Sequence, residues 1–161
     1  MTEDDAIERF WADAKVRANL NRLRAYTGPN ASESLRPPAW AFGDSPELAD
    51  ELVGLVLDGR KTATAGALAD YQAEDEQLPT VGSLSIVTDG AGNPRVLIQT
   101  TGVETLPFGE VDGEHARLEG EGNLSLDHWR EAHRTFFAGF GHEVTDEFPV
   151  VLERFEVLWQ P

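Results

Sequence analysis

The chain has 161 residues and a mass of 17.7 kDa, which is the size of one domain and too small for two full hydrophobic cores. It contains no cysteine, and this excludes disulfide bonds, thiolate metal sites and a cysteine nucleophile. No apolar run approaches the ~20 residues that span a bilayer, and the acidic residues after Met1 are unlike a secretory signal. We therefore expect a cytoplasmic protein that does not enter a membrane.

The formal net charge of −16 is distributed unevenly along the chain. Residues 1–40 carry six basic and six acidic side chains, whereas residues 41–161 carry 7 basic and 23 acidic ones. Because an acidic body repels phosphate backbones, we do not expect broad binding to duplex DNA. Nucleic acid would have to bind at a local basic site, and the simplest role of the acidity itself is solubility.

The N-terminal part of the sequence predicts an amphipathic helix over residues 3–23, with Thr2 as its N-cap. Its apolar side chains recur at spacings of three and four residues, at Ile7, Phe10, Trp11, Ala14 and Ala18. Turn and linker residues follow as far as Pro38 and predict an arm. We interpret residues 1–40 as an N-terminal helix and arm, and residues 41–161 as the main domain. Trp40 and Phe42 either anchor the arm by packing or form a base-stacking platform.

The main domain begins with a strong helix signal. Asp44 and Ser45 precede Pro46, and Gly59 supplies a stop, so the sequence predicts a helix from Pro46 to Asp58. Strands are predicted after it at residues 62–65, 84–88, 95–104 and 150–159, and a turn over residues 90–94 joins the second strand to the third. These elements indicate an α+β fold.

A further helix is predicted after Ser125, its natural N-cap. One face of this helix carries Leu126, Trp129, His133, Phe136 and Phe137. Because His133 falls on this apolar face, we interpret it as a core histidine rather than a catalytic one. His128 lies five residues before His133, which is not the spacing of four that places two imidazoles on one face. We therefore predict no metal site and no cofactor.

Four stretches of the main domain carry a resemblance to a known family. They are residues 42–52, 57–64, 78–87 and 119–133. Through them the chain resembles the ASCH domain family, in particular its longer bacterial members. The resemblance implies a small PUA-like mixed β-barrel with flanking helices, and it leaves the N-terminal helical extension outside the family domain. Members of the family have been assigned RNA binding, ribonuclease action on single strands, or amide hydrolysis on N4-acetylcytidine, and the fold alone does not choose among these activities.

The resemblance also implies a set of catalytic residues, because Lys61, Thr64 and Glu119 match the triad of the amidohydrolase branch. In that chemistry the lysine deprotonates the threonine hydroxyl, the hydroxyl attacks the acyl carbonyl, and the glutamate handles protons at the leaving amine. Positions 61 and 64 of a regular strand point to opposite faces, so convergence requires a bend or a bulge. Gly66 stands where the family pattern often has an arginine that binds anions.

We expect an RNA-derived ligand, either a nucleoside or a single RNA strand, to bind in a cleft beside these residues. Further ligand-binding residues are predicted to be Arg60, Thr62, Tyr71, Ser125, Trp129 and Arg130. The structural alternatives are a surface ion pair for Lys61, strand formation for Thr62 and Thr64, and capping or solvation of a helix for Glu119. Trp129 and Arg130 are otherwise packing residues, and Ser125 is otherwise a helix cap. Two hypotheses therefore stay open, a hydrolase and a binding module without catalysis.

Overall fold

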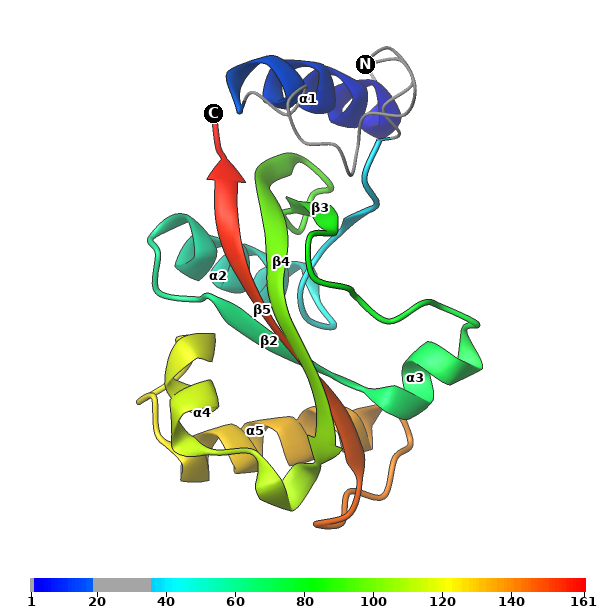
Figure 1. Ribbon diagram of the computed structural model, residues 1–161, viewed down its shortest axis with the longest axis vertical. Helices are drawn as coiled ribbons and strands as arrows, with labels where there is room; N and C mark the ends of the chain where they lie inside the picture. The colour runs from blue at the N-terminus through cyan, green and yellow to red at the C-terminus, as the bar shows by residue number, and fades with distance from the viewer. Residues whose placement is uncertain (1, 19–35) are drawn as a thin grey trace. The chain divides into compact units, whose positions relative to one another are not determined.

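The computed structural model of the protein describes residues 2–18 and 36–161 (Figure 1). The chain divides into two compact units. The first contains residues up to Leu57 together with Gly82–Gln99 and Glu156–Pro161, and the second contains Asp58–Val81 and Thr100–Phe155. The predicted division between residues 1–40 and 41–161 stays a prediction. Each helix within the described residues is too short or too polar to cross a membrane.

The strands form one mixed sheet in the order β1-β3-β4-β5-β2. β1 pairs in parallel with β3, whereas β3 pairs antiparallel with β4 and β2 pairs antiparallel with β5. The sheet and its helices confirm the predicted α+β class, and the closed PUA-like barrel stays a prediction. The strands are β1 (Ala39–Trp40), β2 (Ala63–Ala67), β3 (Leu84–Thr88), β4 (Pro94–Pro107) and β5 (Pro149–Trp159).

The first unit is built around helix α1 (Glu3–Arg17), which begins with a capping box. The Thr2 hydroxyl accepts the Asp5 backbone N–H at 3.2 Å, and the Asp5 carboxylate accepts the Thr2 backbone N–H at 3.1 Å. The predicted apolar face of α1 is buried against β3 and β4, in a cluster of Ile7, Phe10, Trp11, Ala14, Leu84, Ile86 and Leu97. The helix ends at Arg17, before the predicted end at residue 23, and the remainder of that prediction and most of the arm lie outside the described residues.

Helix α2 (Pro46–Leu57) also begins where the sequence predicts, because the Ser45 hydroxyl accepts the Leu48 N–H at 3.1 Å. Its buried side chains are Ala49, Leu52, Val53 and Val56. Trp40 and Phe42 meet edge to face with 4.8 Å between ring centroids, and Phe42 is buried. This contact supports the packing role of the two rings.

The second unit contains the helices α3 (Leu68–Ala73), α4 (Gly113–Glu119) and α5 (Leu126–Gly139) and the 3-10 helix η3 (Phe108–Glu110). Carboxylate and hydroxyl caps start the two longer ones, since Asp112 accepts the His115 N–H at 2.9 Å and Ser125 accepts the His128 N–H at 3.1 Å. The core of this unit packs α4 and α5 against β2 and β5, and comprises Ala67, Phe108, Val111, Ala116, Trp129, Phe137, Val150 and Leu152.

The end of α4 lies directly against the start of β2. The Thr62 N–H donates to the Leu118 carbonyl at 2.8 Å, and Gly120 ends the helix with a φ of +73°. A Cβ at Gly120 would lie 2.3 Å from the Arg60 carbonyl oxygen, so only glycine permits this approach. The close approach brings the side chains that precede β2 to those at the end of α4.

Candidate functional site

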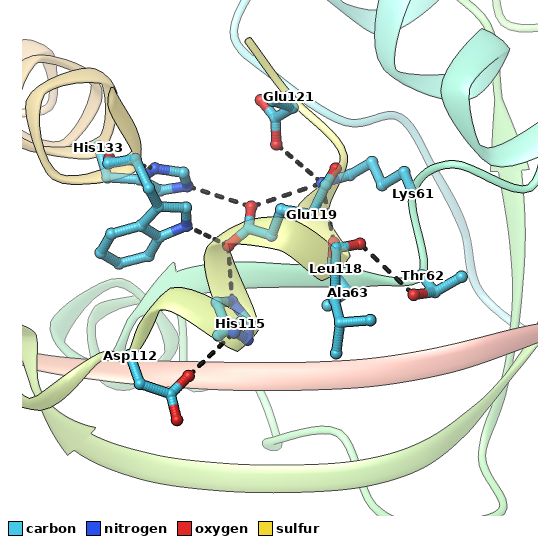
Figure 2. A network of polar contacts seen from close by, with 10 residues as sticks. Lys61, Thr62, Ala63, Asp112, His115, Leu118, Glu119, Glu121 and His133 are labelled. Atoms are coloured by element: carbon cyan, nitrogen blue, oxygen red, sulfur yellow. Dashed lines mark hydrogen bonds and ion pairs between the residues drawn. The ribbon is translucent and has the colours of Figure 1, made fainter. Parts of the chain in front are cut away.

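A buried lysine occupies the junction between α4 and β2. Lys61 is 1% exposed, and its Nζ donates to the Ala63 carbonyl at 2.9 Å and to Glu121 Oε2 at 2.9 Å (Figure 2). The same Nζ lies 3.5 Å from both Glu119 Oε1 and the Glu119 carbonyl oxygen. All of these contacts are acceptors, which suits an ammonium with three N–H donors.

Glu119 is the centre of the network, and it is as buried as Lys61. Its Oε2 accepts from His115 Nε2 at 2.6 Å and from the Trp129 indole N–H, while its Oε1 faces Lys61 and lies 3.3 Å from His133 Nε2. Burial alone would raise the pKa of this carboxyl. The charges of Lys61 and His133 and the hydrogen bonds of the two histidines outweigh burial and hold the pKa well below its usual range.

His133 is the second cation of the network. Its Nδ1 lies 2.9 Å from the Trp129 carbonyl, and its Nε2 faces the Glu119 carboxylate. Because both partners are acceptors, both ring nitrogens carry protons and the ring is an imidazolium. Burial lowers the pKa of His133, but the charge of Glu119 and the hydrogen bond to it raise the pKa further than burial lowers it. The imidazole also stacks on the Trp129 indole with 4.1 Å between centroids.

Glu121 connects the network to the surface, with 27% of its side chain exposed. Burial raises the pKa of this carboxyl, Lys61 opposes that rise, and the neighbouring charge of Glu119 adds to it. Glu121 is thus the carboxyl that solvent or a ligand can reach, whereas Glu119 is enclosed.

The same side chains include a possible metal-ligating group. Atoms of Glu119, Glu121 and His133 lie within 4.8 Å of one another. The Lys61 ammonium already contacts both carboxylates, and His133 would have to lose a proton to bind a metal. These contacts fit the Lys61 ammonium better than a metal ion as the counter-charge of the two carboxylates. The lack of a resident metal stays a prediction.

A pocket of about 270 Å³ adjoins the network through His115. Glu104 of β4 and Arg154 of β5 are its charged lining residues, and Gly102, Val103 and Leu152 complete it. Since His115 also donates to Glu119, this one side chain touches both the pocket and the buried carboxylate.

The sequence model of the ASCH domain matches residues 38–159. The chain belongs to the ASCH domain family. A crystal structure of protein EF3133 from Enterococcus faecalis V583 is similar over 95% of this chain and 88% of that one, with 35% identity and a TM-score of 0.79. The ASCH domain of Lactobacillus crispatus JV V101 is similar over 90% of this chain and 96% of that one, with 31% identity and a TM-score of 0.72. Among curated proteins, none matches the sequence.

In this ASCH domain protein two of the three predicted catalytic residues meet, since Lys61 contacts Glu119. Lys61 precedes β2, and within β2 Thr64 lies on the face opposite to Ala63, Ala65 and Ala67. The pairing of β2 with β5 runs from Ala63 to Ala67 without a register shift, so side chains alternate between the two faces within β2 itself. Ala65 and Ala67 pack on the core beside α5, and Thr64 is the cross-strand neighbour of Glu153 on the opposite face. The role of Thr64 in catalysis stays a prediction.

Most of the other predicted ligand residues have structural contacts of their own, and Arg60 is exposed. The Thr62 hydroxyl donates to the Leu118 carbonyl at 3.4 Å. Ser125 caps α5, Trp129 donates to Glu119, and Arg130 donates to the carbonyls of Gly109 at 3.2 Å and Val111 at 3.4 Å. Tyr71 packs on Gly66, where a Cβ would lie 3.1 Å from the ring. Their contacts with a ligand stay predictions.

Sequence reasoning did not select His115 or Glu121, and it assigned His133 to the core. A signal for His115 exists, because it precedes Glu119 by four residues and so shares its helix face. The second carboxylate of the Glu119-Gly-Glu-Gly run is the signal for Glu121. His133 is indeed largely buried at 12% exposure, but its partner is a carboxylate rather than the apolar core alone.

Proposed function

We propose that this ASCH domain protein is a hydrolase of an RNA-derived ligand, and that an N-acylated nucleoside suits it better than an RNA strand. The observation that carries the proposal is the buried Lys61–Glu119 pair, because Lys61 also hydrogen-bonds to the backbone of the strand that bears Thr64. The family is in general associated with RNA binding, and the hydrolytic step is our inference from these residues.

The Lys61 ammonium donates to the carbonyl of Ala63, the group that forms the peptide bond to Thr64. Lys61 therefore holds the backbone directly before the predicted nucleophile. Its hydrogen-bonding capacity is filled by acceptors, so we assign it a positioning role rather than the role of a base that removes the threonine proton. Thr64 itself is half-buried, and its hydroxyl is the nucleophile of the proposed reaction.

The charge of the second unit favours a small uncharged ligand. Residues 58–81 and 100–155 carry 17 acidic and 6 basic side chains. A polynucleotide would bring many phosphates into this field, whereas a nucleoside brings none. If single-stranded RNA binds at all, the slope of log K against log salt should correspond to only about two or three neutralised phosphates.

A binding module without catalysis is the second candidate. It is favoured by the enclosure of Lys61 and Glu119, each 1% exposed, because neither side chain can touch a ligand without rearrangement. Cleavage of single-stranded RNA is the other hydrolytic alternative, since the substrate can supply its own 2′-hydroxyl as nucleophile and needs no threonine.

The proposal is tested with purified protein and N4-acetylcytidine, with product formation followed by chromatography. Thr64→Val should lower kcat/KM by at least ~100-fold with the fold intact, as expected for loss of the nucleophile. Thr101→Val, which alters an exposed threonine of β4, is the matched control and should leave kcat/KM unchanged. Lys61→Met should lower kcat more than it raises KM if it positions Thr64.

The outcomes separate the candidates. Turnover of single-stranded RNA that survives Thr64→Val and is lost in Lys61→Met would replace the amidohydrolase with a ribonuclease. If the wild-type protein binds nucleoside or RNA and turns over neither substrate, both hydrolase candidates are rejected and the protein is a binding module without catalysis.

A further inference from the structure

A second polar cluster lies on the face of β2 and β5 opposite to Ala65 and Leu152, which pack on the core. We call Thr64, Tyr71, Thr100 and Glu153 the Glu153 cluster. Glu153 is the direct antiparallel partner of Thr64, so the two side chains leave the sheet on the same face with Cβ atoms ~4.5–5.5 Å apart. The Thr100 hydroxyl donates to Glu153 Oε2 at 2.8 Å.

Tyr71 covers the same face two residues further along β2. Its ring packs where a side chain of Gly66 would stand, and Gly66 follows Thr64 by two positions, which places both on one face. Burial, together with the charges of Glu153 and Glu76, raises the pKa of Tyr71 to about 12. At neutral pH Tyr71 is therefore an uncharged phenol and a hydrogen-bond donor.

Glu153 is an unfavourable residue for stability at this position. It is 7% exposed, and burial raises the pKa of its carboxyl while the Thr100 hydrogen bond opposes that rise. The buried Glu119, in contrast, has Lys61 and His133 as counter-charges. Within residues 2–18 and 36–161 the Glu153 carboxyl has the Thr100 hydroxyl as its hydrogen-bond donor and no ion pair. A buried carboxylate without a counter-charge costs folding free energy, and glutamine would avoid the cost while keeping the shape. Such a cost is typical of groups that are retained for function.

We propose that Glu153 is the general base and acid for the Thr64 hydroxyl, an assignment that rests on the proposed acyl hydrolysis and names the proton acceptor that the Lys61 network does not supply. Thr64 is partly exposed while Glu153, its cross-strand neighbour, is buried, so an acyl group can reach the threonine and the carboxylate can stay shielded from bulk water. Nucleophile and base then come from neighbouring positions of two paired strands, which is a rigid arrangement.

Water is the only reactant that the reaction needs besides the acylated substrate. The Thr64 oxygen attacks the acyl carbon while Glu153 takes the hydroxyl proton, and Tyr71 donates a hydrogen bond to the acyl oxygen. The bond to the leaving amine then breaks, and Glu153 returns the proton to that amine. A water molecule next attacks the acyl carbon of the Thr64 ester while Glu153 takes the water proton. The bond between the acyl carbon and the Thr64 oxygen breaks, and Glu153 returns the proton to that oxygen, which releases the acid and restores the hydroxyl.

The test is acetylation of Thr64 by p-nitrophenyl acetate in the full-length protein, located by peptide mass mapping after rapid acid quenching. Wild type should carry the acetyl group on Thr64, and Glu153→Gln should slow that labelling by at least ~100-fold. Glu156→Gln changes an exposed glutamate of the same strand and should label like wild type. Glu153→Asp, which keeps the carboxyl and shortens the side chain by one methylene, should give an intermediate rate.

The free energy of unfolding of the same variants, measured in denaturant, distinguishes a catalytic role of Glu153 from a structural one. If Glu153 is retained for chemistry, Glu153→Gln should be as stable as wild type or more stable at pH 7. Absence of acetyl on Thr64 in wild type, or equal labelling rates in wild type and Glu153→Gln, would overturn the assignment. Thr64 labelling that depends on Glu153, combined with no turnover of N4-acetylcytidine, would uphold the assignment and reject only the proposed substrate.

Discussion

Replacing Lys61 by methionine tests the buried network most directly. Methionine keeps most of the side-chain volume and removes the ammonium, which leaves Glu119 as a carboxylate that is 1% exposed. Removing one partner of a buried ion pair typically costs about 3–5 kcal/mol. Because His133, His115 and Trp129 still donate to Glu119, we expect the lower end of this range, about 3 kcal/mol.

Guanidinium unfolding at pH 7 measures this loss, and for a chain of this length about 3 kcal/mol corresponds to a fall in Tm of roughly 6–12 °C. Lys15→Met is the matched control. Its ammonium lies 5.6 Å from the Trp11 ring centroid on the partly exposed side of α1, so the loss should stay within about 1 kcal/mol. The double variant Lys61→Met/Glu119→Gln should recover at least about 1 kcal/mol of the sum of the single losses. A loss below 1 kcal/mol in Lys61→Met, or strict additivity in the double variant, would refute the buried pair.

Three other predictions follow from named contacts. Since the native pKa of Glu119 lies well below its ordinary value of 4.5, its stabilisation is complete above pH 4.5 and is lost as pH falls through the native pKa; acid titration of unfolding should show a shallower decline in Glu119→Gln. Gly120→Ala should destabilise the fold by about 2 kcal/mol in thermal melts. Gly113→Ala, with open space around the glycine, should not destabilise it. Ser125→Ala should cost about 1 kcal/mol in the same melts through loss of the α5 cap, and an unchanged melt would contradict that role.

Local sequence signals predicted the elements with strong caps and long apolar periodicity. Thr2, Ser45 and Ser125 each cap the helix that the sequence assigns to them. The six-residue α3 escaped prediction because it has no side-chain cap at Ala67 and buries no residue fully, so neither end signals nor periodicity mark it. Helix α4 is not predicted as a helix either, since seven residues are too few to show a period.

The site was only partly accessible from the sequence. The meeting of Lys61 and Glu119 followed from family resemblance, and no spacing argument joins residues 58 positions apart. Glu121 and His133 enter the network because Gly120 turns the chain beside Arg60 and because α5 presents His133 to the end of α4. The place of Thr64 on the face of β2 opposite to Ala63 and Ala65, in contrast, follows from strand alternation alone, which the pairing with β5 preserves.

The burial of Lys61 has a practical consequence for following the folding of the chain. The sequence contains two lysines, Lys15 and Lys61, and Lys15 is partly exposed. Amine-reactive reagents should modify Lys15 in the native protein and reach Lys61 only when α4 separates from β2. The fraction of Lys61 labelled over time therefore measures the rate at which this junction opens, and Lys15 of the same molecule serves as the internal standard.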